Sequence, residues 1–118
     1  EIARRDNFSK KIVAQGKVID FIEQQLSEMQ QALFDKAKLF RKQNITKVDD
    51  FDEFKKVIEN KGGFVSAHWD GTDATEEAIK KQTKATIRCI PLDAKEESGT
   101  CVYSGKPSTK RVLFAKAY

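Results

Sequence analysis

The chain has 118 residues, of which 39% are hydrophobic and 34% are charged, with 6 Gly, 2 Pro and a formal net charge of +4. This composition excludes collagen-like, low-complexity and membrane-spanning proteins. A chain of this length buries enough surface for one core, so disulfides and metals are optional, and we expect one domain with an appendage.

Residues 1–8 show no clear period and start without Met, which is typical of the cut end of a longer protein. From residue 17 to residue 41, apolar side chains recur every three or four positions, at Val18, Ile22, Leu26, Met29, Leu33, Ala37 and Phe40. This spacing predicts a long helix with one apolar stripe. The stripe fits the buried face of a helix better than a coiled-coil seam, because only about three and a half heptads are present.

Two shorter helices are predicted by capping-box patterns, in which an acidic residue is followed by Glu three positions later: Asp50 with Glu53, and Asp73 with Glu76. The first helix would cover 51–60 and end at a glycine pair, because glycine adopts the left-handed conformation that stops a helix. The second would cover 73–83.

Four runs of apolar and β-branched residues are typical of strands: 64–69, 85–90, 101–103 and 111–115. The last two flank a turn at 104–107 and are predicted to form a hairpin. The order of elements predicts an α+β fold, a two-layer α/β sandwich with a small mixed β-sheet covered by helices on one face and preceded by a long helix. The first two strands would pair in parallel through a right-handed crossover. We expect an apolar core of Phe64, Val65, Trp69, Ile79, Ile87, Ile90, Val112 and Phe114.

No cluster of residues in this sequence could carry out a reaction alone. Cys89, Cys101 and the single His68 are scattered and lack the spacing of zinc ligands. We expect His68 to be a packed residue and not a base, because no neighbouring residue in the sequence orients it. Both cysteines are expected to be reduced, as in a cytosolic protein.

The C-terminal end is basic. From residue 105 to residue 118 there is no acid, and the basic residues are Lys106, Lys110, Arg111 and Lys116. Such a segment is a candidate RNA-binding surface, because each phosphate contact releases a counterion. A solvated strand face explains the same residues more simply. A free-standing RNA-binding module is therefore the alternative hypothesis for the function.

Several strings, in a fixed order, carry a family resemblance. They are Gly-Gly-Phe at 62–64, Ala-His-Trp-Asp-Gly at 67–71, Lys-Ala-Thr-Ile-Arg-Cys-Ile-Pro-Leu at 84–92, Gly-Lys-Pro at 105–107 and Val-Leu-Phe-Ala-Lys-Ala-Tyr at 112–118. Together they resemble the C-terminal domain of prolyl-tRNA synthetases of the archaeal and eukaryotic-like type. Residues 4–6, Arg-Arg-Asp, resemble the last strand of the anticodon-binding domain that precedes this module in the family.

The resemblance implies three segments: a remnant of that strand at 1–8, a long connecting helix and linker at 9–48, and a C-terminal α/β domain of zinc-binding type at 49–118. The family fold is similar to the C-terminal domain of translation initiation factor three. The segment would hold no catalytic residue and be inactive alone, although the terminal carboxylate of Tyr118 would reach back toward the active site of the parent.

The parent implied by the resemblance is a proline–tRNA ligase, a cytoplasmic class II homodimer with no membrane segment. It would activate L-proline with ATP and Mg²⁺ and transfer it to tRNA(Pro). The partners of this module would be the catalytic and anticodon-binding domains of the same chain.

Many members of the family bind zinc in this domain, through one Cys pair after the Trp and a second pair around the Cys-Val segment. Here Asp70 and Thr75 occupy the positions of the first pair, Cys101 is retained, and Tyr103 or Ser104 stands in place of its companion. One ligand of four cannot hold the metal. We therefore expect a domain without zinc and without any cofactor of its own.

Overall fold

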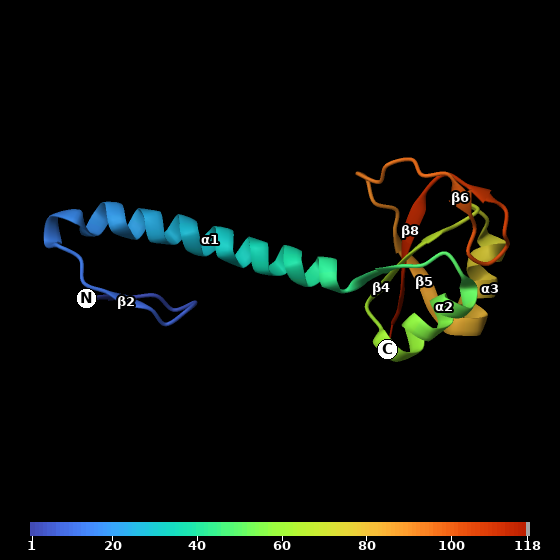
Figure 1. Cartoon of the computed structure of the whole chain (residues 1–118), viewed down its shortest axis with the longest axis horizontal. Helices are drawn as coiled ribbons and strands as arrows, with labels where there is room; N and C mark the ends of the chain where they lie inside the picture. Colours follow the sequence, from blue (N-terminus) through green and yellow to red (C-terminus); the bar gives the residue numbers. More distant parts are fainter. Residues whose placement is uncertain (118) are drawn as a thin grey trace. The chain divides into compact units, whose positions relative to one another are not determined.

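The computed structural model of the chain describes residues 1–117 (Figure 1). The chain forms two compact units, Glu1–Arg41 and Lys42–Tyr118. The three predicted helices and three of the four predicted strands are present within them, together with five short strands that were not predicted and a different strand order.

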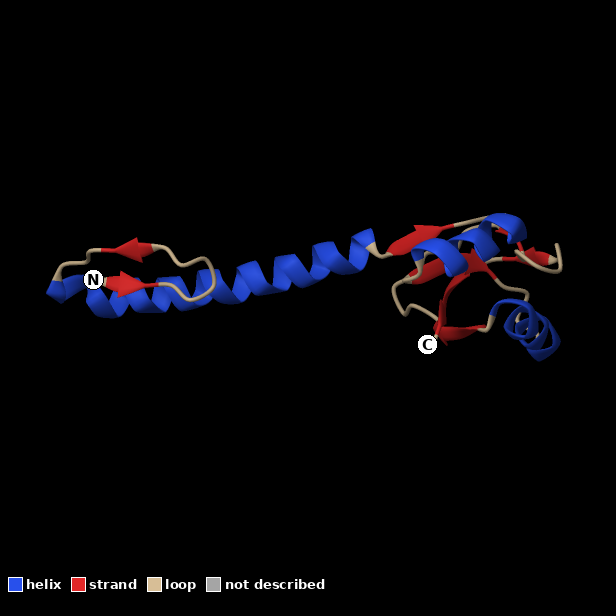
Figure 2. Ribbon diagram, turned by 90° about the horizontal axis from the view of Figure 1, so that it is seen from below, coloured by secondary structure: helices blue, strands red, loops and turns tan. Residues whose placement is uncertain are grey.

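The first unit is a short hairpin beside a long helix. β1 (Ile2–Ala3) pairs antiparallel with β2 (Lys10–Lys11), and a 3-10 turn, η1 (Gln15–Lys17), leads into α1 (Val18–Gln43). The hairpin lies along the N-terminal half of α1 (Figure 2). Arg4 fastens it there, because its guanidinium donates hydrogen bonds to Gln25 and Glu28 on the helix.

The apolar stripe of α1 is not the buried face that its spacing favoured. No residue of α1 is buried, and Leu26 and Leu33 are 60% and 56% exposed. The hairpin contacts the helix between Phe21 and Met29. The first unit holds no other element that could cover the remaining turns of the stripe, so the prediction of a buried stripe is wrong for residues 1–117.

The second unit is built on a four-stranded mixed sheet with the order β3-β4-β8-β5. β3 (Ile45–Lys47) runs parallel to β4 (Phe64–His68). β8 (Arg111–Lys116) runs antiparallel to both of its neighbours, β4 and β5 (Ala85–Cys89). A register shift interrupts the pairing of β5 between Ile87 and Cys89.

Two helical segments cover one face of this sheet (Figure 2). The first is α2 (Phe51–Lys56), which continues into a π-helical turn, η2 (Val57–Lys61), and the second is α3 (Asp73–Thr83). A small additional pair, β6 (Gly99–Thr100) with β7 (Pro107–Ser108), precedes β8.

The core lies between the helices and the sheet. The ring of Phe54 in α2 meets the ring of Phe114 in β8 edge-on, with centroids 5.2 Å apart. Ile79 of α3 and Val65 of β4 are also fully buried in this cluster. The predicted α+β fold, with a small mixed sheet preceded by a long helix, is confirmed.

The predicted topology is wrong in two places. β4 and β5 are not neighbours, because β8 lies between them, and the parallel pair is instead β3 with β4, joined through α2 and η2. The segment 101–104 is a turn and not a strand, so the hairpin with 111–115 does not form. β8 takes the centre of the sheet because its inward side chains, Val112 and Phe114, are among the most buried in the chain.

Two expected core residues are exposed instead. Phe64 is 38% exposed because it alternates with the buried Val65 and so lies on the opposite face of β4. Ile90 is 54% exposed because it follows the end of β5. Of the other six, Trp69 and Ile87 are partly buried and the rest are buried.

Of the two predicted caps, the first is confirmed. The Asp50 side chain accepts the amide of Glu53 at 2.9 Å. The second helix is capped by Thr72 in place of Asp73, since the Thr72 side chain accepts the amide of Thr75. The Glu76 carboxylate accepts the amide of Ile87 on the neighbouring strand.

Candidate functional site

The two positions at which the family resemblance places the first zinc pair, Asp70 and Thr75, lie close together, and the carboxylate of Asp70 is the centre of a hydrogen-bond cluster. Asp70 follows β4, Thr75 lies in the first turn of α3, and Ser104 lies in the turn after β6. The hydroxyls of Thr75 and Ser104 both donate to Oδ2 of Asp70, at 2.8 and 2.7 Å. Its other oxygen, Oδ1, accepts the amide and the hydroxyl of Thr72, at 3.1 and 2.8 Å.

These hydrogen bonds hold Asp70 ionised. Burial alone would raise its pKa, but the bonds from Ser104, Thr72 and Thr75 outweigh burial and lower the pKa from 3.8 to about 2. We call these four residues, Asp70, Thr72, Thr75 and Ser104, the Asp70 cluster.

The remaining zinc-pair positions are Cys101 and the residue that would accompany it. Cys101 is buried. Tyr103 turns away from the Asp70 cluster, since its ring packs edge-on against Phe51 and its hydroxyl accepts a hydrogen bond from Gln82. Of the two candidates for the companion of Cys101, Tyr103 and Ser104, the one that faces Asp70 is therefore Ser104. Among residues 1–117, no group of three or more His, Cys, Asp and Glu side chains could hold a metal ion.

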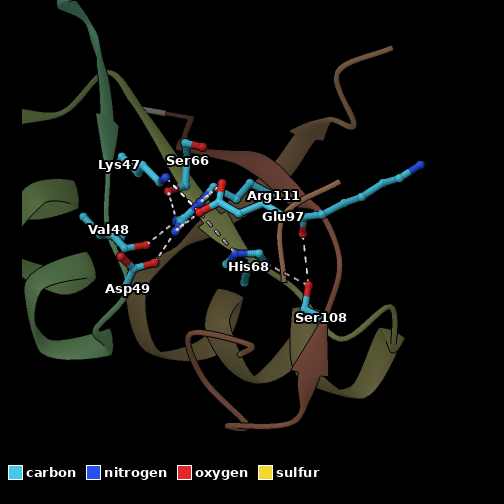
Figure 3. A network of polar contacts seen from close by, with 9 residues as sticks. Lys47, Val48, Asp49, Ser66, His68, Glu97, Ser108 and Arg111 are labelled. Carbon is cyan, nitrogen blue, oxygen red and sulfur yellow. Dashed lines mark hydrogen bonds and ion pairs between the residues drawn. The ribbon is translucent and has the colours of Figure 1, made fainter. Parts of the chain in front are cut away.

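A second polar network surrounds Arg111 in β8 (Figure 3). Its guanidinium donates to the backbone carbonyls of Val48 and Ser66, at 2.9 and 3.3 Å, and to the carboxylates of Asp49 and Glu97. Hydrogen bonds from Arg111 and from Lys47 lower the pKa of Glu97 from 4.5 to about 2. Arg111 thereby joins β8 to the end of β3, to the middle of β4 and to the loop before β6.

His68 borders this network and is buried, as predicted, with 2% exposure. Its Nδ1 lies 3.1 Å from Oγ of Ser108, and that hydroxyl donates to the carbonyl of Lys110 at 3.0 Å. The Ser108 proton is therefore engaged, and His68 donates from Nδ1. Nε2 of His68 has no hydrogen-bond partner among the described residues and lies 3.9 Å from Glu97.

His68 contacts Ser108 on one side and Glu97 on the other. These are the residue types of a hydrolase triad, but their geometry does not give them that function. A nucleophile must be exposed, whereas Ser108 is buried and its hydroxyl points to a backbone carbonyl. The backbone of Gly99 closes the other side of the ring, since a Cβ built there would lie 2.3 Å from Nε2 of His68. The geometry gives these residues a packing role and no substrate access.

The four predicted basic residues do not act as one free surface. Lys106, Lys110 and Lys116 are exposed, but Arg111 is largely enclosed and ion-paired with Asp49 and Glu97. The predicted role of Tyr118 lies outside the described residues.

Sequence reasoning missed the acids of the Arg111 network and the role of Thr72 and Ser104. The Asp-x-Thr spacing of Asp70 and Thr72, typical of a local turn in which the carboxylate accepts a nearby amide and hydroxyl, was a usable signal. No local pattern links Ser104 to Asp70 or Glu97 to Arg111.

Comparison with known proteins agrees with the resemblance. A family model described as "Prolyl-tRNA synthetase, C-terminal" matches residues 51–118. The chain belongs to this family. It is 64% identical to the proline–tRNA ligase of Flavobacterium johnsoniae, 58% to that of Christiangramia forsetii and 51% to that of Cytophaga hutchinsonii. Each alignment covers 100% of this chain but 24% of the relative, so the prolyl-tRNA synthetase segment described here spans about a quarter of its relatives' length.

Within residues 1–117, no helix combines the length and the apolar character needed to cross a bilayer.

Proposed function

We propose that this chain is the C-terminal part of a proline–tRNA ligase, a class II synthetase that activates L-proline with ATP and Mg²⁺ and transfers it to tRNA(Pro). The observation that carries the proposal is the match over the whole chain to curated proline–tRNA ligases, at up to 64% identity in the relatives named above. The parent works as a homodimer in the cytoplasm.

Within that enzyme the module has a structural, active-site-supporting role. The polar groups of its networks either bond to neighbouring residues, as Arg111 does, or are enclosed, as Ser108 is. The module therefore supplies no reacting group of its own. The catalytic and anticodon-binding domains of the parent chain are its partners, and the carboxylate of Tyr118 reaches the active-site cleft. The alternative of a free-standing RNA-binding module has no support, because Arg111 is held by acids.

The test is proline-dependent ATP–pyrophosphate exchange by the full-length product of the reading frame. The intact enzyme, a variant lacking Ala117 and Tyr118, and the 118-residue chain alone are compared. We expect exchange by the intact enzyme, a large loss on truncation and none by the chain alone. No proline-dependent exchange by the intact protein would refute the ligase proposal, whereas full exchange after truncation would refute only the role of Tyr118.

A further inference from the structure

The Asp70 cluster joins the start of α3 to the turn at 101–106. Backbone hydrogen bonds hold these segments only in part. The turn at 101–106 is closed by the bond from the Cys101 amide to the Lys106 carbonyl, at 2.7 Å. Its first half is fixed to the end of β4, because the amide of Val102 donates to the carbonyl of His68 at 3.0 Å. In its second half, Ser104 reaches across to Asp70 through its side chain.

The start of α3 is held by the same carboxylate. Thr75, which is buried, donates to Oδ2, and Thr72, the cap of α3, donates to Oδ1. One carboxylate thus accepts hydrogen bonds from the helix start on one side and from the turn on the other. The bonds involve an ionised acceptor, which makes them stronger than bonds between neutral groups.

A zinc ion does not fit this donor set. Zinc requires deprotonated thiolate, imidazole or carboxylate ligands, whereas Thr75 and Ser104 present protonated hydroxyls that already donate to Asp70. Both carboxylate oxygens are occupied by these donors. Cys101 is the single thiol among the positions at which the family resemblance places zinc ligands.

We propose that Asp70 replaces the metal of the zinc-binding members as the cross-link between the start of α3 and the turn at 101–106. The ionised carboxylate and its three hydroxyl donors form a metal-free clasp, and the domain folds without zinc. The proposal rests on family membership and on the contacts above, and it does not depend on the ligase activity.

The first experiment asks whether the domain uses a metal at all. The 118-residue chain is purified without added zinc, its metal content is measured, and its unfolding by denaturant is followed with and without a chelator. A stoichiometric site would hold about one zinc ion per chain, and we expect less than about one-tenth of that amount. The unfolding midpoint should be the same with and without the chelator. Near-stoichiometric zinc, or a chelator-induced loss of stability, would overturn the proposal.

The second experiment removes the charge. Asp70→Asn puts an amide group where a carboxylate oxygen accepts hydroxyl protons, so we expect the folding equilibrium constant to fall by about tenfold or more. Asp93→Asn is the matched control, because Asp93 is exposed in the loop before β6, and it should leave the constant unchanged. Equal stability of the two variants would exclude a clasp.

A gentler variant covers the case in which Asp70→Asn does not fold. Ser104→Ala keeps the carboxylate and the cap of α3 and removes only the bond across the turn, so we expect a fall of about threefold to tenfold. Ser98→Ala, at an exposed position of the preceding loop, is its control. A Ser104→Ala chain as stable as this control would refute the cross-link.

A third experiment asks whether the clasp occupies the position of the metal. Asp70→Cys, Thr75→Cys and Ser104→Cys are combined with the native Cys101, and Cd²⁺ is titrated as a zinc probe with a thiolate absorption band. We expect one ion per chain, and weaker binding when Cys101→Ser is added. Absence of binding would refute the replacement of the metal by Asp70.

Discussion

At the scale of single residues, Arg111 shows how a charge suited to a nucleic-acid surface is used inside the fold. Its guanidinium donates to two backbone carbonyls, of Val48 just after β3 and of Ser66 within β4. A buried carbonyl such as that of Val48 needs such a donor, because an unpaired one costs free energy. The acids Asp49 and Glu97 balance the charge in place.

Glu97 provides a prediction of acid sensitivity. Its pKa is about 2 in the folded chain and 4.5 ordinarily, so its contribution to stability is fully present above pH 4.5 and is lost as the pH falls through about 2. Glu97→Gln should lower the stability at pH 7, and the variant should lose less further stability than wild type between pH 5 and pH 2. Denaturant unfolding at several pH values measures both effects.

Glu96→Gln is the control for this prediction, because Glu96 is the exposed neighbour of Glu97. Its stability should follow that of wild type at every pH. Parallel acid curves for Glu97→Gln and wild type would show that the carboxylate does not contribute through Arg111 and Lys47.

At the scale of elements, the end of the helical segment formed by α2 and η2 depends on two glycines. Gly62 and Gly63 have φ values of +67° and +77°, a region that side chains with a Cβ avoid. They reverse the chain so that the amide of Phe64 donates to the carbonyl of Asn44 at 2.8 Å, beside the pairing of β3 with β4. The glycine stop predicted from the sequence therefore also places the edge strand.

Gly63→Ala tests this close approach. A Cβ at residue 63 would lie 2.6 Å from the Asn44 carbonyl oxygen, so steric overlap adds to the strain of positive φ. We expect a loss of about 2 kcal/mol or more in the free energy of unfolding.

Gly105→Ala is the matched control. Gly105 has a φ of +69° but nothing within 4 Å of its added Cβ, so only the strain of about 1 kcal/mol should appear. Equal losses in the two variants would show that the Asn44 contact is not a constraint.

At the scale of the whole molecule, the two units differ in what stabilises them. No residue of the unit Glu1–Arg41 is buried, whereas the unit Lys42–Tyr118 holds the entire buried core. Burial of apolar surface is the main source of folding free energy. The first unit therefore depends on helical hydrogen bonds and a few side-chain contacts such as those of Arg4.

Hydrogen exchange should reveal this difference in the 118-residue chain. We expect amides in α1, such as that of Leu33, to exchange at least about tenfold faster than those of Val65 and Phe114 in the central strands. The reason is that α1 opens without uncovering a core. Exchange followed by NMR or mass spectrometry measures this, and equal protection of α1 and the central strands would contradict it.

The sequence by itself determined the local elements. Periodicity located α1, and capping and glycine signals located α2 and α3, because these depend on residues within a few positions of one another. Ordered strings of residues identified the family, and Trp69 with Asp70 marked one corner of the later site.

Only the tertiary structure decided which distant segments meet. β8 lies between β4 and β5, Glu97 meets Arg111, and Ser104 meets Asp70 across 34 positions of the chain. None of these contacts has a local signal, because sheet order and side-chain networks follow from how the whole core packs. The exposed stripe of α1 has the same cause, since periodicity shows that a face is apolar but not what lies against it.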